Sequence, residues 1–95
     1  MDLETFEASL AAAAPPADLA PALQALWWDA KGDWDRAHRS VDSEVGRQDA
    51  LVHAYLHRKE GDAGNAAYWY RQAGAAPAEG SLDTEWRRIL EALLA

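Results

Sequence analysis

The sequence contains no cysteine among its 95 residues, and β-branched residues are scarce, with a single isoleucine and three valines. Without cysteine the chain cannot form a disulfide, a thiolate zinc site or a cysteine nucleophile. The shortage of β-branched residues disfavours strands, whereas 22 alanines favour helix, so we expect an all-α fold. A chain of this length forms one domain with a modest core, which excludes a separate catalytic domain.

Positive charge is also in short supply. Nine lysines and arginines face 16 aspartates and glutamates, giving a net charge of −7 and an isoelectric point near 4.7. Such an acidic chain repels phosphate backbones and anionic lipid, so we expect no nucleic-acid partner and no membrane partner. The acidic start at Met1 and the short apolar run from Leu10 to Ala14 do not fit a signal peptide or a membrane span, which predicts a cytoplasmic location.

Two segments 29 residues apart share one pattern, in which Gly-Asp is followed by an alanine four residues after the aspartate. They are residues 32–37 and 61–66. We expect Gly32 and Gly61 to end helices in the left-handed conformation, and the aspartate after each to cap the next helix. A helical hairpin that occurs twice indicates a repeat architecture, whose units bury their apolar faces by stacking on one another.

Apolar periodicity extends this pattern to five or six helices. The first is expected over Leu3–Ala13, and the second between a cap at Asp18 and the turn at Gly32, with Pro21 in its first turn. The later helices are expected at about 34–43, 48–60, 63–73 and from 82 onward. The single domain, 1–95, divides into an N-terminal helix and linker (1–16), a first hairpin (17–45), a second hairpin (46–77) and a capping helix (81–95).

The last predicted helix is amphipathic. Its apolar stripe runs from Leu82 through Trp86 and Ile89 to Leu93, while Glu85 and the other charged residues are expected largely on the opposite side. We predict that this helix covers the open end of the repeat stack, with Trp86 in the core.

The second unit resembles a known repeat family. The segment Gly61-Asp62-x-x-x-Ala66-x-x-x-Tyr70-x-x-Ala73 resembles the second half of a tetratricopeptide repeat, and residues 66–73 are similar to the second helix of Sel1-like repeats. The resemblance covers about residues 22–77, with a period of 29 in place of the usual 34. It implies stacked helical hairpins. Strings such as His53–Asp62 are also similar to those of small uncharacterised bacterial and fungal proteins, a likeness that implies no function.

Three polar residues recur at helical spacing in the first helix of the second unit. His53, His57 and Glu60 lie four and three residues apart, which places them on one face, where two imidazoles and a carboxylate can bind a divalent metal. The alternative is that both histidines are packing residues, hydrogen-bonded to neighbouring carbonyls or carboxylates. His38, in the preceding helix, could approach them across the stack.

Aromatic residues are the second unusual feature, with five tryptophans and three tyrosines. Adjacent helical residues point 100° apart, so one of Trp27 and Trp28, and one of Tyr68 and Trp69, should be partly exposed. Arginines and a lysine lie near these aromatics, either as a clamp for a carboxylate or in solvated ion pairs with Glu60, Asp62 or Glu44. The residues expected to line a binding groove are Tyr55, His57, Arg58, Asn65, Tyr68, Trp69 and Arg71.

These features favour a small protein-interaction or adaptor module that binds a protein or peptide and needs no cofactor. Two other interpretations stay open. One is a small metal-binding protein or enzyme centred on His53 and His57, and the other is a homodimer that buries its own aromatic surface. No catalytic residue set is visible, because the sequence has no Ser-His-Asp order, phosphate-binding glycine loop or paired catalytic carboxylates.

Overall fold

A computed structural model describes all 95 residues, and the fold is all-helical, as the composition predicts. None of its helices combines the length and the apolar character needed to cross a membrane. The six helices are α1 (Leu3–Ser9), α2 (Pro21–Ala30), α3 (Trp34–Val41), α4 (Arg47–Glu60), α5 (Ala63–Ala73) and α6 (Leu82–Leu94).

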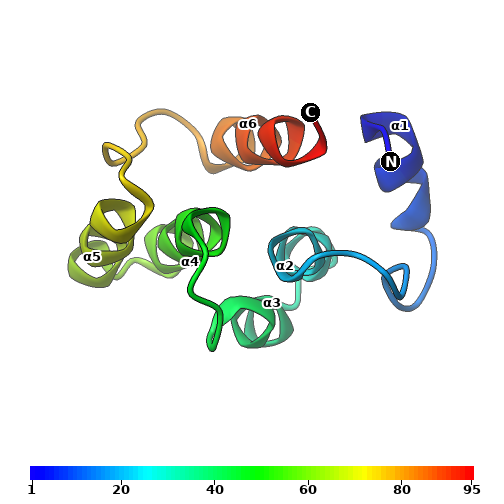
Figure 1. The fold of residues 1–95 in the computed structure, drawn as a ribbon, viewed down its shortest axis with the longest axis horizontal. Helices are drawn as coiled ribbons and strands as arrows, with labels where there is room; N and C mark the ends of the chain where they lie inside the picture. Colours follow the sequence, from blue (N-terminus) through cyan, green and yellow to red (C-terminus); the bar gives the residue numbers. More distant parts are fainter.

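The helices pack around α4. The helices α2 and α3 are neighbours, α5 packs along α4, and α4 also contacts α2, α3 and α6. Figure 1 shows α6 on the side of α4 and α2 that lies opposite α3, while α1 is next to the C-terminal end of α6. Because α4 has neighbours on several sides, its central residues are buried almost all round.

The two Gly-Asp turns have the predicted geometry. Gly32 and Gly61 have φ values of +81° and +90°, in the left-handed region that favours glycine. The carboxylate of Asp33 accepts a hydrogen bond from the backbone N–H of Arg36 at 3.0 Å, and Asp62 caps α5 in the same way. The predictions that these glycines end helices and that these aspartates begin the next ones are confirmed.

The N-terminal helix is shorter than expected. It ends at Ser9 rather than Ala13, because the N–H groups of Leu10, Ala11 and Ala12 bond to carbonyl oxygens three residues back, which is a tighter turn than the α-helix. The ammonium group of Lys31 donates to the carbonyl oxygens of Leu10 and Ala12, at 2.7 and 3.2 Å. These bonds satisfy two carbonyl groups beyond the end of α1.

The predicted cap of α2 is wrong. Pro21 takes the first helical position, where its fixed φ suits a helix start, so the cap position falls on Ala20 and not on Asp18. No side chain caps α2. The remaining helix bounds agree with the expected ones to within two residues, the usual uncertainty of helix ends.

The main core joins α1, α2, α3, α4 and α6, and a smaller cluster of Ala54, Ala66 and Tyr70 lies between α4 and α5. Phe6, Leu26, Trp27 and Leu56 are fully buried in the main core. The remaining core residues are Leu19, Ala22, Ala25, Ala37, Val41, Val52, Tyr55, Ile89 and Leu90. The predicted stripe of α6 packs against this cluster, because Ile89 and Leu90 belong to it and Leu82, Trp86 and Leu93 lie partly buried beside it. The stripe therefore packs on the core as predicted, but α6 lies over α2 and α4 rather than at the outer end of the second hairpin.

One charged residue of α6 does not lie on the solvent side as expected. Glu85 is only 2% exposed. Its two carboxylate oxygens accept hydrogen bonds from the Tyr70 hydroxyl at 2.5 Å and from the Arg58 guanidinium at 2.8 Å. The prediction was wrong because α6 is covered on a second side by Tyr70 and the chain that precedes the helix. Burial and the bond to Glu85 hold the pKa of the Tyr70 phenol above its ordinary value.

A second carboxylate is buried in the same manner. Asp29, at 5% exposure, accepts from the Tyr55 hydroxyl at 2.6 Å and from the Lys59 ammonium at 2.8 Å. Burial, followed by the bond to Asp29, raises the pKa of the Tyr55 phenol. Arg58 and Lys59 of α4 thus pair with two buried carboxylates. They do not form the expected solvated ion pairs with Glu60, Asp62 or Glu44.

Candidate metal centre

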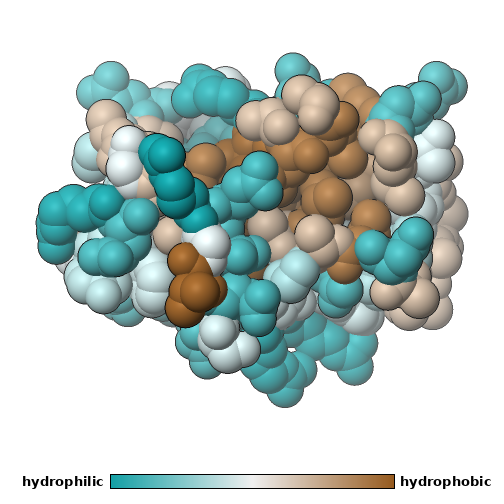
Figure 2. Space-filling view, in the orientation of Figure 1, coloured by the Kyte–Doolittle hydropathy of each residue, from teal (hydrophilic) through white to brown (hydrophobic).

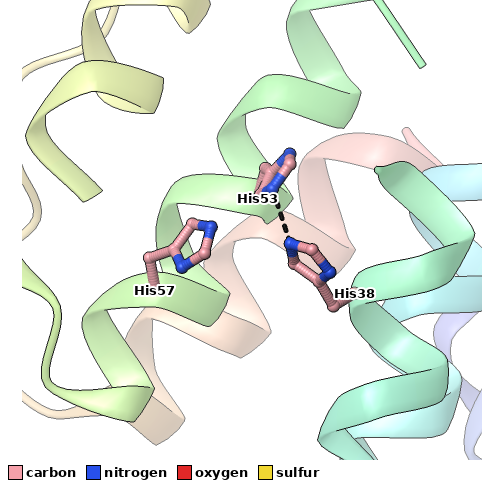
Figure 3. A group of neighbouring side chains, drawn as sticks. All are labelled: His38, His53 and His57. Carbon is pink, nitrogen blue, oxygen red and sulfur yellow. Dashed lines mark hydrogen bonds between the residues drawn. The ribbon is translucent and has the colours of Figure 1, made fainter. Parts of the chain in front are cut away.

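All three histidines of the chain converge at the contact between α3 and α4. His38 comes from α3, and His53 and His57 come from successive turns of α4. Figure 3 shows the three rings turned toward one another, with a hydrogen bond between His53 and His38. The two Nε2 atoms of that bond are 3.0 Å apart. One ring nitrogen of each histidine lies within 4.8 Å of those of the other two. The approach of His38 is as the sequence analysis anticipated.

Two tryptophans enclose the cluster. The Trp69 ring stacks on the His53 ring with centroids 4.0 Å apart and 12° between the planes. Trp34 stacks on His38 at 4.9 Å and 9°. The indole N–H of Trp34 donates to the carbonyl oxygen of Leu56 at 2.8 Å, which fixes this ring against α4. This stacking limits rotation of the His38 and His53 imidazoles.

The histidines differ in their access to solvent. His53 is 2% exposed and His57 6%, whereas the His38 side chain is 23% exposed. The cluster is therefore reached from solvent past His38, at the end of α3.

Glu60 fixes the orientation of His57. Its Oε2 atom lies 2.6 Å from Nδ1 of His57, and this contact leaves Nε2 free. In Figure 3 the other ring nitrogen of His57 faces His53 and His38. Metal-binding histidines commonly donate their second N–H to a carboxylate, which sets the tautomer and the direction of the ligand nitrogen. Among the residues predicted as ligands, His53 and His57 therefore face the cluster, whereas Glu60 supports His57 from behind.

His53 has an unusual environment for a histidine. Burial, then the charges of His38 and His57, lower the pKa of His53 to about 4, so its ring is neutral at neutral pH. Its Nδ1 atom is buried and has no hydrogen-bond partner. Most buried polar atoms are paired, and an unpaired one costs free energy. The interpretation of both histidines as hydrogen-bonded packing residues thus fits His57, which is paired with Glu60, but it does not explain the unpaired Nδ1 of His53.

A carboxylate borders the cluster on its open side. Oδ1 of Asp42 lies 3.8 Å from Nε2 of His38, one helical turn further along the chain. The Asp42 side chain is 61% exposed. Sequence analysis did not single out this residue, although the His38-x-x-x-Asp42 spacing was available as a signal.

The residues predicted to line a groove lie on different sides of the molecule. Tyr55 and His57 are buried, and Arg58 is held by Glu85. Trp69 covers His53, so its indole belongs to the histidine cluster. The other three predicted residues are exposed on α5, namely Asn65, Tyr68 and Arg71. These seven side chains therefore do not form one continuous groove.

The exposure predicted within the aromatic pairs is confirmed. Trp27 is fully buried, while Trp28 is partly exposed and lies 4.6 Å from the Arg36 guanidinium. Tyr68 is 45% exposed next to the partly buried Trp69. The aromatic residues thus divide between core, histidine cluster and surface rather than forming one patch.

The donor set suits a transition-metal ion. Imidazole nitrogen is a ligand of zinc, copper, iron and nickel, and zinc in particular takes four ligands at tetrahedral positions. Two nitrogens bound to one tetrahedral zinc ion lie about 3.3 Å apart, because each Zn–N bond is about 2.0 to 2.1 Å long. The His38–His53 spacing of 3.0 Å is close to this value. A His57 nitrogen lies within 4.8 Å of the other two and would have to come closer to complete a three-nitrogen site.

Comparison with protein-family models finds no model that matches the chain, and comparisons with curated proteins and with solved structures find no significant match.

Proposed function

We propose that this protein binds one zinc ion between α3 and α4 through Nε2 of His38, His53 and His57. The observation that carries the proposal is the convergence of every histidine in the chain on one point, with a ring nitrogen from each within 4.8 Å of the others. Packing alone does not require three imidazoles to turn their nitrogens toward one another. The zinc ion would take the place of the hydrogen bond between Nε2 of His53 and Nε2 of His38, whereas Nδ1 of His53 would stay unpaired.

The surroundings support a cation. Glu60 orients His57, and Asp42 adds negative charge at the open side, in a chain of net charge −7. Trp34 and Trp69 hold two of the rings in place by stacking. The ligand atoms are therefore held near their binding positions, which lowers the entropy cost of binding an ion.

The ion would connect two halves of the molecule. His38 belongs to the hairpin of α2 and α3, while His53 and His57 belong to the hairpin of α4 and α5. A metal bound to both hairpins stabilises the folded state, because the unfolded chain offers no preformed site. Small domains commonly gain stability in this way. We therefore propose a structural role for the zinc ion in a two-hairpin domain of tetratricopeptide-like type.

Isothermal titration calorimetry of metal-free protein with zinc tests the proposal. We expect one ion per chain with a dissociation constant in the micromolar range or below, and an affinity at least about tenfold lower for His38→Ala and His57→Ala. Glu91→Ala, which removes an exposed carboxylate of α6, is the matched control and should bind like the wild type. Circular dichroism establishes that each variant is folded.

Two results would contradict the proposal. One is a wild-type protein that binds no zinc at these concentrations. The other is a folded His38→Ala variant that binds zinc as tightly as the wild type. Zinc would then bind to exposed carboxylates, or to His53 and His57 without His38.

A second candidate function is the protein interaction predicted from the sequence. It is supported by an apolar area visible in Figure 2, on the face where α2 begins and α6 ends. A hollow there is lined by Met1, Asp18, Leu19, Ala20, Leu23, Leu93 and Leu94. Analytical ultracentrifugation over a range of concentrations tests self-association, the homodimer alternative. Leu93→Glu should abolish any dimer formed through this area, and a dimer that persists in this variant would place the contact elsewhere.

A further inference from the structure

We infer that Asp42 is the fourth ligand of the proposed zinc ion, which makes the site a closed centre of three histidines and one aspartate. This inference rests on the proposed zinc binding. It decides between two kinds of zinc site, because structural sites have four protein ligands, whereas catalytic sites keep one position open for water or substrate.

The position of Asp42 fits the missing ligand. Its Oδ1 lies 3.8 Å from Nε2 of His38, and an oxygen and a nitrogen bound to one tetrahedral zinc ion lie about 3.3 Å apart. Asp42 lies outside the group of three histidines whose ligand atoms are all within 4.8 Å of one another, so its carboxylate would have to swing toward His53 and His57 by about 1.5 Å or more to reach the ion. The side chain is free to move, because it is 61% exposed.

The sequence spacing supports the same conclusion. His38 and Asp42 are four residues apart at the C-terminal end of α3, and His53 and His57 are four residues apart in α4. Residues at this spacing lie on one helical face, so two facing helices each present a pair of ligands. Glu60 does not compete for the fourth position, because it contacts Nδ1 of His57.

The fourth protein ligand has a functional consequence. A zinc ion with four protein ligands holds no exchangeable water, so it cannot lower the pKa of a bound water to supply a hydroxide nucleophile. The proposed ion then acts by joining α3 to α4 and not by hydrolysis. Asp42 also carries a negative charge that partly neutralises the ion at the only side open to solvent.

Cobalt(II) provides a direct test, because it replaces zinc in tetrahedral sites and its visible absorption reports the ligands. We expect the metal-free wild-type protein to give an intense tetrahedral spectrum with one equivalent of cobalt. Azide should leave this spectrum unchanged, because no coordination position is open. Asp42→Ala should bind cobalt at least about tenfold more weakly, and azide should now shift its spectrum by taking the open position.

Two further variants sharpen the test. Asp42→His supplies another nitrogen ligand from the same position, so it should restore both tight binding and indifference to azide. Asp35→Ala removes an exposed carboxylate from the other end of α3 and should behave like the wild type.

The possible failures are distinguishable. A wild-type spectrum that shifts with azide, or an Asp42→Ala variant that matches the wild type in affinity and in its response to azide, overturns the role of Asp42 and leaves the three-histidine site standing. Absence of any tetrahedral cobalt spectrum in the wild type, together with absence of zinc binding in calorimetry, overturns the metal site itself.

Discussion

Glu85 provides the sharpest test of the packing, because it is a carboxylate buried between α4, α5 and α6. Replacement by alanine removes the acceptor of the Tyr70 hydroxyl and of the Arg58 guanidinium. Tyr70 is 2% exposed, so its hydroxyl loses its protein partner in a buried position. An unpaired buried hydroxyl costs about 1 to 3 kcal/mol.

The loss at Arg58 is smaller. Its side chain is 24% exposed, and it also donates to the carbonyl oxygen of Gly80, so it remains partly solvated and partly paired. We assign about 1 kcal/mol to this contact after allowing for solvent screening. Together, the two losses predict that Glu85→Ala lowers the free energy of unfolding by about 2 to 4 kcal/mol, a large share of the stability of a small domain.

Urea denaturation followed by tryptophan fluorescence and circular dichroism measures this change. The control Glu91→Ala, an exposed carboxylate of the same helix, should change the free energy by less than about 0.5 kcal/mol. Adding Tyr70→Phe to Glu85→Ala should recover part of the loss, because it removes the unpaired hydroxyl. A loss below about 1 kcal/mol for Glu85→Ala, or equal losses for both glutamates, would refute the argument.

Three further predictions concern the cap, the turns and the histidines. Trp86→Ala should lower the free energy of unfolding in urea by about 3 kcal/mol, because the ring packs on the core and its N–H donates to the Leu26 carbonyl oxygen at 3.1 Å. A loss below about 1 kcal/mol would mean that α6 does not dock. Gly61→Ala should destabilise the protein by about 1 kcal/mol because Gly61 has a positive φ, whereas Gly64→Ala inside α5 should be neutral or stabilising. Destabilisation by both substitutions, or by neither, would contradict the turn geometry. In metal-free protein, the pKa of His53 is lower in the folded chain than in the unfolded chain, so the unfolded chain binds more protons between these two values. The free energy of unfolding should therefore fall by up to about 3 kcal/mol as the pH drops from about 6.5 to about 4. A free energy of unfolding that is constant over this range would contradict the burial of a neutral ring.

The helices and turns could be predicted because their causes are local. Gly61 ends α4 and Asp62 caps α5 through contacts within a few residues, and the stripe that ends at Leu93 follows from helical periodicity. The cap of α2 was predicted incorrectly for an equally local reason. The fixed backbone of Pro21 sets the helix start and overrides the capping preference of Asp18.

The candidate site could be predicted only in part, because it depends on how α3 crosses α4. The spacing of His53 and His57 within one helix indicated a possible pair of ligands. The distance of His38 from them follows from packing between helices and leaves no local signature, whereas the four-residue spacing of His38 and Asp42 was a local signal that the sequence analysis did not use. Glu85 was misplaced for the same reason, since a one-sided stripe does not reveal that a second element covers the polar face.

The central claim is that the three imidazoles bind one zinc ion together, and anomalous scattering from crystals grown with one equivalent of zinc tests it most directly. The account predicts one strong peak at the zinc edge, about 2.0 to 2.1 Å from Nε2 of each of His38, His53 and His57. A map without a peak between these rings, or with zinc bound only to surface carboxylates, would contradict it.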